Sequence, residues 1–262
     1  MSSIKIPDLL KLKDYITLIG TTLGIIAIIC ACMGTRAYIS LGFFLISITL
    51  GTDLIDGYVA RKTKTMNEIG KELDSLSDSL TFGIAPAILT FQAFRTNTIY
   101  DIVIVIGSLC FVFGAILRLA RFNISEVPGY TGLPTPISAL ILITYFYSNY
   151  FYAYGMGGNN NYPFLVFTSY LIPIFMIFFA WFNVTTFIRF NEKDKIIYVV
   201  FIVIAPLCPI FGIIGILNPN FYVSMGISIF FLASFLLALI LIIRGFILHF
   251  RRKDSAETRY KS

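Results

Sequence analysis

Long apolar stretches are the feature that most limits what this chain can fold into. Eight of them approach the length of about 20 residues that a helix needs to cross the hydrocarbon core of a bilayer, and together they take up most of the 262 residues. The stretches are residues 17–33, 38–59, 73–94, 99–120, 133–154, 162–186, 196–217 and 221–248. Only 13% of the residues are charged and 57% are hydrophobic, whereas a soluble domain carries about 25% charged residues. The sequence therefore predicts an all-α fold, a polytopic membrane bundle of eight transmembrane helices, and it excludes a disordered or nucleic-acid-binding chain.

The basic residues predict the orientation of this bundle. An even number of spans places both termini on one side of the membrane, and lysine and arginine collect in cytoplasmic loops. If the N-terminus is cytoplasmic, 18 of the 20 basic residues lie on the cytoplasmic side, and only Arg36 and Arg95 lie outside. We therefore expect an integral protein of the cell membrane whose two termini are cytoplasmic.

The chain reads as a single integral membrane domain, residues 1–262, with a polar segment at each end. Residues 1–16 interleave apolar and charged positions without an uninterrupted apolar core, which predicts an amphipathic interfacial helix and not a cleavable signal peptide. Residues 249–262 are rich in arginine and lysine and are expected to form a basic cytoplasmic tail. All four cysteines, Cys30, Cys32, Cys110 and Cys208, fall within predicted spans. We expect them to be small buried hydrophobic residues without disulfides.

Acidic residues gather where the second span ends and the third begins. Asp53 and Asp56 are three residues apart, and Asp74 and Asp78 are four apart, so each pair shares one helical face. A charged group near the bilayer centre costs about 2.5 to 3.5 kcal/mol, so four unpaired acids would cost on the order of 10 kcal/mol. The short connection makes the two helices antiparallel neighbours. Two facing carboxylate pairs offer the hard oxygen ligands that Mg²⁺, Mn²⁺ or Ca²⁺ prefers.

Small residues and an arginine accompany these acids. They are Gly57, Ala60, Arg61 and Gly70. Small residues let a bulky ligand approach the backbone, and the guanidinium fork suits phosphate. Each of these residues alone has an ordinary structural explanation, but together they predict a divalent-metal site that holds a pyrophosphate at the membrane surface.

The eight residues resemble a known family signature. They form the pattern Asp53-x2-Asp56-Gly57-x2-Ala60-Arg61-x8-Gly70-x3-Asp74-x3-Asp78, which resembles that of the CDP-alcohol phosphatidyltransferase family without departure. The family comprises membrane enzymes that move a phosphatidyl-type group from a CDP-linked lipid to an alcohol and release CMP. Segments 70–86, 117–123 and 132–136 are similar to its phosphatidylserine synthase branch, in which Asp8 and Gly20 of this chain often have asparagine as counterpart.

The resemblance implies a role for each signature residue. One divalent ion would be held by Asp53, Asp56 and Asp74, and a second by Asp53, Asp74 and Asp78, the ions being Mg²⁺ or Mn²⁺, with Ca²⁺ as a further occupant. The CDP part of a CDP-diacylglycerol-type lipid would contact Gly57, Ala60, Arg61 and Gly70. Asp78 would be the general base that takes the proton from the acceptor hydroxyl. The family also implies a homodimer.

Serine as the acceptor requires a partner for its carboxylate. Arg118 and Arg121 lie three residues apart at the end of the fourth span and are the candidates for this serine-binding role, with Asn123 in the same pocket. The alternative is that both arginines are anchors that extend to lipid headgroups. Because the motif places no serine, cysteine or histidine nucleophile, direct transfer is favoured over a lipid-linked enzyme intermediate.

Two other functions remain open at this stage. The acceptor within the same family could be glycerol phosphate or inositol phosphate, either of which would need extra basic residues for its phosphate. An ion-coupled transporter that uses Asp53 and Asp74 would place acids near the membrane midplane and show repeat symmetry, which the sequence lacks. The sequence does not decide between ester-linked acyl and ether-linked isoprenoid tails on the lipid.

Overall fold

The computed structural model describes residues 10–63, 68–125, 130–157, 163–187, 189–190, 195–217 and 220–261. Its helices are α2 (Leu12–Met33), α3 (Arg36–Thr63), α4 (Glu68–Asp78), η1 (Ser79–Ile84), α5 (Ala85–Phe94), α6 (Asp101–Ile124), α7 (Thr135–Gly157), α8 (Val166–Val184), α9 (Lys195–Leu217) and α10 (Phe221–Lys261). Strands β1 (Tyr130–Thr131) and β2 (Arg189–Phe190) form one short antiparallel pair.

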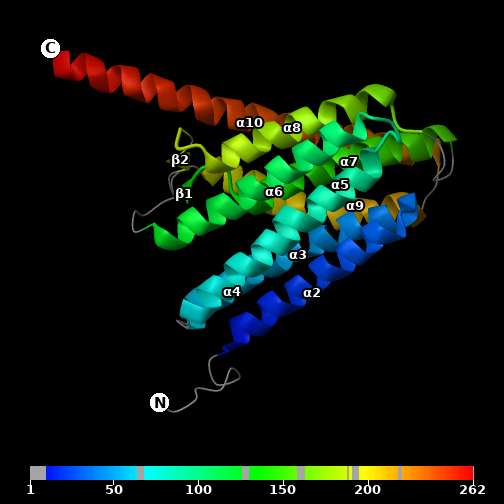
Figure 1. The fold of residues 1–262 in the computed structure, drawn as a ribbon, viewed down its shortest axis with the longest axis horizontal. Coiled ribbons are helices and arrows are strands. Elements are labelled where there is room, and N and C mark those ends of the chain that lie inside the picture. Colours follow the sequence, from blue (N-terminus) through cyan, green and yellow to red (C-terminus); the bar gives the residue numbers. More distant parts are fainter. Residues whose placement is uncertain are drawn as a thin grey trace.

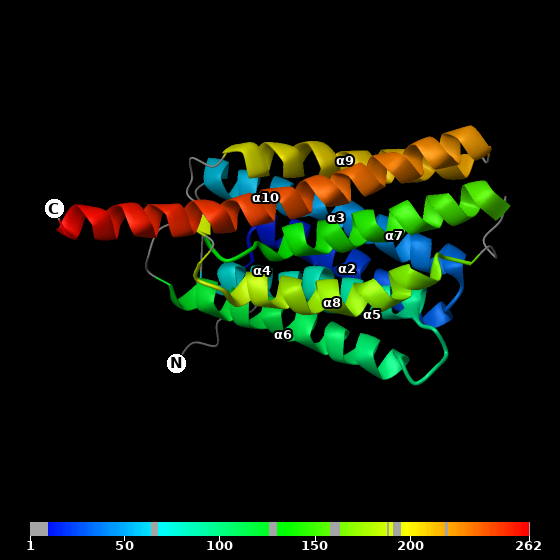
Figure 2. The same ribbon diagram turned by 90° about the horizontal axis from the view of Figure 1, so that it is seen from above.

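The described helices make eight passes along one bundle (Figure 1). The third pass is a continuous helix built from α4, η1 and α5. The ends of α2, α5, α7 and α9 and the starts of α3, α6, α8 and α10 all lie at the same end of the bundle (Figure 2). The start of α2 and the end of α10 lie toward the other end, as an even number of passes requires. The prediction of an all-α bundle with eight passes is confirmed.

Four described helices are long and apolar enough to cross a membrane by length and composition. They are α2, α6, α8 and residues Phe221–Ile247 of α10. Their outer faces expose large apolar side chains, such as Ile29 at 55%, Phe113 at 58% and Val166 at 70%. Surfaces of this kind are unfavourable in water and favourable against lipid tails. The chain is an integral membrane protein.

Helix α7 forms the centre of the bundle (Figure 2), and most of its residues are buried. Phe146 stacks on Phe43 of α3 with ring centroids 4.3 Å apart, and Tyr147 stacks on Phe231 of α10 at 5.1 Å. Buried tyrosine hydroxyls need acceptors, and the Tyr147 hydroxyl donates to the Ser40 carbonyl at 3.1 Å. Aromatic packing therefore holds this helix between its neighbours.

Helix α2 begins earlier than the hydropathy predicts. Its first residue is Leu12, and the Asp14 carboxylate accepts the backbone N–H of Lys11 at 2.7 Å, which satisfies a donor at the helix start. The expected separate interfacial helix over residues 1–16 is therefore wrong for residues 12–16, which belong to α2. Residues 1–9 lie outside the described part of the chain.

The cysteine prediction holds in part. Cys30 and Cys208 are buried, Cys110 is half-buried and Cys32 is exposed, and all four are free thiols. The expected burial is wrong for Cys32, because it lies one residue beyond the buried residues Cys30 and Ala31.

A π-helical segment interrupts the third pass directly after Asp78. In η1 the backbone N–H of Ala85 donates to the carbonyl of Leu80, five residues earlier. Such segments are rare and often lie at functional sites. No feature of the sequence predicted it.

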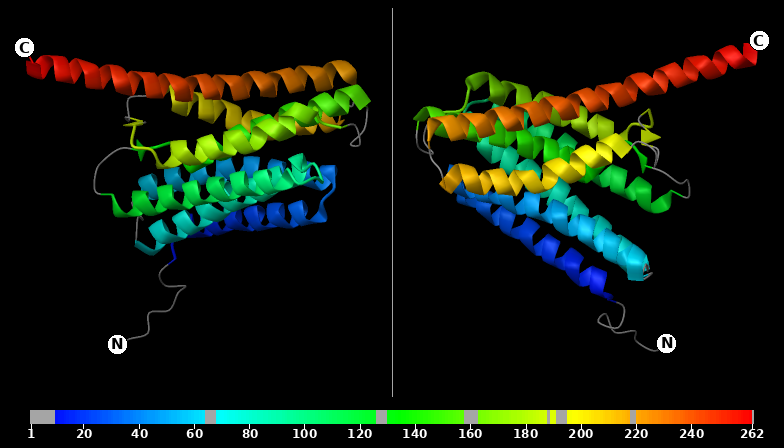
Figure 3. Two further views of the ribbon diagram at one scale, coloured as in Figure 1. Left: turned by 45° about the horizontal axis from the view of Figure 1, so that its top comes forward. Right: turned by 180° about the vertical axis from the view of Figure 1, so that it is seen from behind.

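Helix α10 extends past the rest of the bundle (Figure 3). It has 41 residues, and at about 1.5 Å per residue it is about 60 Å long, roughly twice the thickness of a hydrocarbon core of about 30 Å. The expected basic tail, residues 249–262, has a helical backbone as far as Lys261, while its side chains lie outside the described part.

Candidate active site

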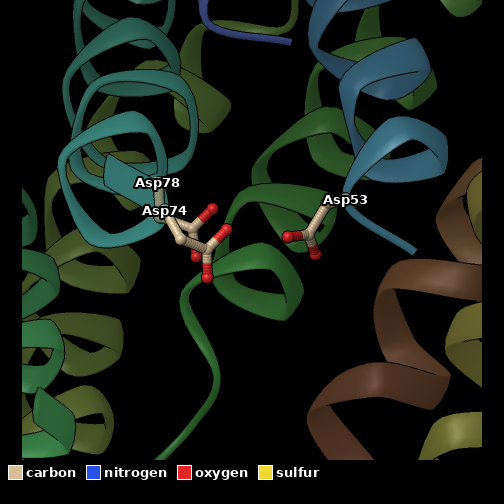
Figure 4. Close-up of side chains that lie close together, drawn as sticks. All are labelled: Asp53, Asp74 and Asp78. Atoms are coloured by element: carbon tan, nitrogen blue, oxygen red, sulfur yellow. The ribbon is translucent and has the colours of Figure 1, made fainter. Parts of the chain in front are cut away.

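Three carboxylates from two helices meet near one end of the bundle. Asp74 and Asp78, one turn apart on α4, point toward Asp53 on α3 (Figure 4). One ligand oxygen from each lies within 4.8 Å of the others, and all three side chains are half-buried. Carboxylates this close repel one another unless a cation lies between them, and an all-oxygen donor set suits Mg²⁺ or Mn²⁺. The residues present therefore fit a divalent metal ion.

The remaining signature residues are placed less completely. Gly70 is buried in the first turn of α4. Asp56, Gly57, Ala60 and Arg61 belong to the last part of α3, but their side chains lie outside the described part of the structure. The antiparallel approach of α3 and α4 thus brings together three of the four predicted metal ligands.

A polar pocket adjoins the acids. Its lining comes from α2, α3, α4 and η1, and consists of Thr17, Gly20, Thr49, Thr52, Asp53, Asp74, Ser77, Asp78, Thr81 and Phe82. Four hydroxyls of this lining donate to backbone carbonyls three or four residues earlier, Thr17 at 3.2 Å, Thr49 at 2.7 Å, Thr52 at 3.0 Å and Thr81 at 2.8 Å. Because each hydroxyl proton is already donated to a carbonyl, each hydroxyl oxygen is available to the pocket only as a hydrogen-bond acceptor. The sequence reasoning missed these hydroxyls, since serine and threonine are common within membrane helices.

Two glycines allow α2 to approach this pocket. A Cβ at Gly20 would lie 2.9 Å from the Thr52 hydroxyl, and one at Gly24 would collide with the side chain of Thr81. Both contacts are tighter than a side chain tolerates without rearrangement. The G-x-x-x-G spacing in α2 therefore marks a close helix contact beside the acids.

A buried ion pair at the start of α2 was also missed. The Lys13 ammonium lies 3.3 Å from the Asp14 carboxylate, and both side chains are buried. Among the described residues, Lys13, Asp14 and Arg118 interact electrostatically with Asp74. The available signal was the pair of adjacent charges directly before the first apolar stretch, which resembled an interfacial segment.

Arg118 lies on the site side of α6. It is only 7% exposed, and its Nη1 donates to the Thr135 hydroxyl at 2.8 Å. Thr135 is the first residue of α7 and is fully buried. The start of α7 thus orients a guanidinium whose charge acts on Asp74.

Arg121 points to a different partner. Its two terminal nitrogens donate to the backbone carbonyls of Asn183 and Val184, at the end of α8, where a cation is favourable. The same corner requires Gly132, whose φ is +82° and whose added Cβ would collide with the Asn183 carbonyl oxygen. Arg118 and Arg121 therefore serve different helices although they share a face of α6.

Asn123, near the end of α6, bonds to α4. Its Oδ1 accepts from the Ser75 hydroxyl at 2.9 Å, and its Nδ2 donates to the Glu72 carboxylate at 3.2 Å. Of the three residues predicted to bind serine, Arg118 is thus the one whose charge acts on Asp74, while hydrogen bonds join Arg121 to α8 and Asn123 to α4.

Asn183, in a helix without a recognisable motif, was missed altogether. Its fully buried carboxamide bonds to the Ser138 hydroxyl of α7 at 2.6 Å, and the Leu133 N–H donates to the Phe182 carbonyl at 2.8 Å. These bonds join the end of α8 to α7 and to the turn that precedes α7. The sequence itself offered only one signal, an asparagine near the end of an apolar stretch.

Comparisons with known proteins agree with this geometry. The CDP-alcohol phosphatidyltransferase family model matches residues 10–249. The chain is 38% identical over 138 residues to a CDP-diacylglycerol–serine O-phosphatidyltransferase of Methanocaldococcus jannaschii, covering 53% of this chain and 61% of that protein. It is 36% identical over 157 residues to an archaetidylserine synthase of Methanothermobacter thermautotrophicus, covering 58% of this chain and 64% of that one. The matches thus span less than two thirds of the length of these relatives.

Proposed function

The chain belongs to the CDP-alcohol phosphatidyltransferase family, and we propose that it transfers a phosphatidyl or archaetidyl group from a CDP-linked lipid to the hydroxyl of L-serine, releasing CMP. The observation that carries this proposal is the meeting of Asp53, Asp74 and Asp78 within 4.8 Å. The relatives named above support serine as the acceptor, because both carry names of serine-transferring enzymes. They include one phosphatidyl and one archaetidyl enzyme, so the class of lipid tail stays open.

The three carboxylates, together with Asp56, would hold two divalent ions. When bound, Mg²⁺ or Mn²⁺ supplies charge stabilisation for the diphosphate and the transferring phosphoryl group. The CDP part is assigned to Gly57, Ala60, Arg61 and Gly70 on the strength of the family signature. Gly70 is buried in the first turn of α4, and because it has no side chain a ligand can approach the backbone there.

Asp78 is the proposed general base. It would take the proton from the serine hydroxyl while the hydroxyl oxygen attacks the lipid-side phosphorus, and the bond from that phosphorus to CMP breaks. Direct displacement is supported by the pocket hydroxyls, since those of Thr49, Thr52 and Thr81 already donate to backbone carbonyls. A hydroxyl that is not bonded to a base is a weak nucleophile.

Arg118 is the first choice as partner for the serine carboxylate. It is buried, it is oriented by Thr135 and its charge acts on Asp74, and guanidinium groups bind carboxylates through two parallel hydrogen bonds. Arg121 remains a predicted contributor to the same pocket, although its hydrogen bonds join it to α8. The hydrogen bonds of Asn123 join it to α4 instead, which gives it a role other than binding serine.

The setting of the reaction completes the proposal. We place the enzyme in the cell membrane, with its substrate lipid among the surrounding lipids and with both termini and the site facing the cytoplasm, because 18 of the 20 basic residues belong to that side in an eight-span topology. A homodimer is expected from the family.

The test is a transfer assay with purified protein. CDP-diacylglycerol or its isoprenoid-ether counterpart is supplied with Mn²⁺ or Mg²⁺, and L-serine, glycerol 3-phosphate and inositol phosphate are offered in turn while CMP release is measured. We expect release with L-serine alone, and none in the Asp78→Asn variant. Equal or faster release with either phosphate-bearing acceptor would contradict the serine assignment, and a covalent lipid adduct on the chain would contradict direct displacement.

A further inference from the structure

Asn123 joins the end of α6 to the helix that carries two of the three acids. We propose that Asn123 is a positioning residue, which fixes the rotation of α4 and so sets Asp74 and Asp78 at the distance from Asp53 that a divalent metal ion requires. The inference rests on the metal site of the proposed function. It assigns Asn123 to the metal ligands, whereas the sequence pattern assigned it to serine.

Three hydrogen bonds form the contact, which we call the α4–α6 clasp. The Ser75 hydroxyl donates to Asn123 Oδ1 at 2.9 Å, and Asn123 Nδ2 donates to Glu72 Oε2 at 3.2 Å. The Lys71 ammonium donates to the backbone carbonyl of Asn123 at 2.6 Å. Both ends of the carboxamide are therefore bonded to α4, and the turn that they hold, residues 71–75, includes Asp74.

A second contact holds α4 from another direction. The Thr21 hydroxyl of α2 donates to the Ser77 hydroxyl at 2.7 Å. Successive helical residues point about 100° apart, so Ser75 faces α6, Ser77 faces α2 and Asp74 faces Asp53. Contacts in two directions fix the rotation of α4 about its axis, whereas with either contact alone α4 can still rotate about that contact.

The tolerance of a metal site makes this rotation consequential. A carboxylate about 6 Å from the helix axis moves by about 2 Å when the helix rotates by about 20°. Metal–ligand distances are held within about 0.2 Å. Loss of the clasp should therefore weaken metal binding even though Asn123 is not itself a ligand. Substitution of a residue that hydrogen-bonds a metal ligand directly lowers metal affinity by about 10-fold to 100-fold, and we expect a loss of similar size when the helix that carries two ligands can rotate.

One hydrogen bond of the clasp can be broken and then restored by substitutions that keep the size of both side chains. In Asn123→Asp a new carboxylate faces that of Glu72, so the second hydrogen bond is replaced by repulsion. Adding Glu72→Gln supplies an amide donor to the new carboxylate and restores the bond with its polarity reversed. Ser125→Ala, at an exposed position two residues farther along, is the matched control.

The experiment measures Mn²⁺ binding by electron paramagnetic resonance of the purified full-length protein without substrates, and the KM for serine at saturating Mn²⁺. We expect Asn123→Ala and Asn123→Asp to raise the Kd for Mn²⁺ by about 10-fold or more, Asn123→Asp with Glu72→Gln to bind within about threefold of the parent, and Ser125→Ala to match it. The KM for serine should stay within about twofold in all four variants.

Unchanged Mn²⁺ binding in Asn123→Ala, with or without a raised KM for serine, would overturn the inference. If that variant does not fold, the comparison of Asn123→Asp with its Glu72→Gln partner decides, and equal Mn²⁺ affinities in the two would overturn it. The metal measurement is independent of transfer: parent protein that binds Mn²⁺ but releases no CMP contradicts the proposed function alone, and parent protein that binds no Mn²⁺ contradicts the metal site and the clasp together.

Discussion

Arg118 and Thr135 are joined by a hydrogen bond of 2.8 Å between Nη1 and the threonine hydroxyl. The bond links the last turns of α6 to the first residue of α7. The segment before Thr135 is bonded to α8, because the Leu133 N–H donates to the Phe182 carbonyl. The orientation of one arginine beside the acids therefore depends on three helices, all of which lie beyond the signature residues.

Replacing Arg118 tests its proposed contact with serine. Arg118→Ala should raise the KM for serine by 10-fold or more while the KM for the CDP-lipid changes by about twofold, since a hydrogen bond to a charged group contributes about 1.5 to 3 kcal/mol. Steady-state kinetics with each substrate varied in turn measures both constants. A larger effect on the CDP-lipid would reassign Arg118 to the lipid phosphate.

Replacing Thr135 tests the orientation of that arginine. Thr135→Val keeps the size of the side chain and removes the hydroxyl acceptor, so the KM for serine should rise by about three- to tenfold, less than in Arg118→Ala. The double variant should be no worse than Arg118→Ala, because both act through one interaction. Additive losses would show that Thr135 acts independently of Arg118.

Removing the proposed base should lower turnover far more than it weakens binding of the CDP-lipid. Asp78→Asn should lower kcat by at least about 10³-fold, because the proton acceptor is lost and a metal ligand is weakened. Binding of the CDP-lipid, followed by isothermal titration with Mg²⁺ present, should weaken far less. Turnover within about tenfold of the parent would exclude Asp78 as the base.

Chelation should stop transfer reversibly. Excess EDTA removes the divalent ions that three close carboxylates require, so CMP release should cease and return on addition of Mn²⁺ or Mg²⁺. Circular dichroism should show the helical content unchanged, because the helices are held by packing and not by the site. Activity that survives chelation would contradict a metal-dependent reaction.

Two glycines with positive φ provide a matched pair for stability. Gly132→Ala meets both the strain of φ +82° and a collision with the Asn183 carbonyl, whereas Gly34→Ala meets only the strain of φ +71°, its nearest neighbour being 4.0 Å away. We expect Gly34→Ala to cost about 1 to 2 kcal/mol and Gly132→Ala to cost more. Thermal unfolding in detergent compares them, and equal melting temperatures would argue against the collision.

Hydropathy predicted the eight passes because each requires only an apolar segment of sufficient length. The meeting of Asp53 with Asp74 and Asp78 followed from helical spacing and a short connection. These are local properties that a sequence displays directly.

The remaining features depend on partners distant in the chain. Arg118 and Arg121 share a face of α6, yet one bonds to the start of α7 and the other to the end of α8, which no spacing could reveal. The charges of Lys13 and Asp14 resembled an interfacial segment, but both are buried at the start of α2. The π turn after Asp78 leaves no residue pattern of its own.

The burial of α7 has a consequence for biogenesis. Tyr145, Tyr147 and Asn149 lie within α7, which is not one of the four described helices that are long and apolar enough to cross a membrane by composition, and a translocon would release such a segment into lipid reluctantly. Its partners include the last helix to be synthesised, since the Ser228 hydroxyl of α10 donates to the Ser148 carbonyl at 2.7 Å. We therefore expect the nascent chain to settle α7 only after α10 leaves the ribosome, so that a product truncated before residue 221 would retain every signature residue and still be a substrate for quality-control proteolysis.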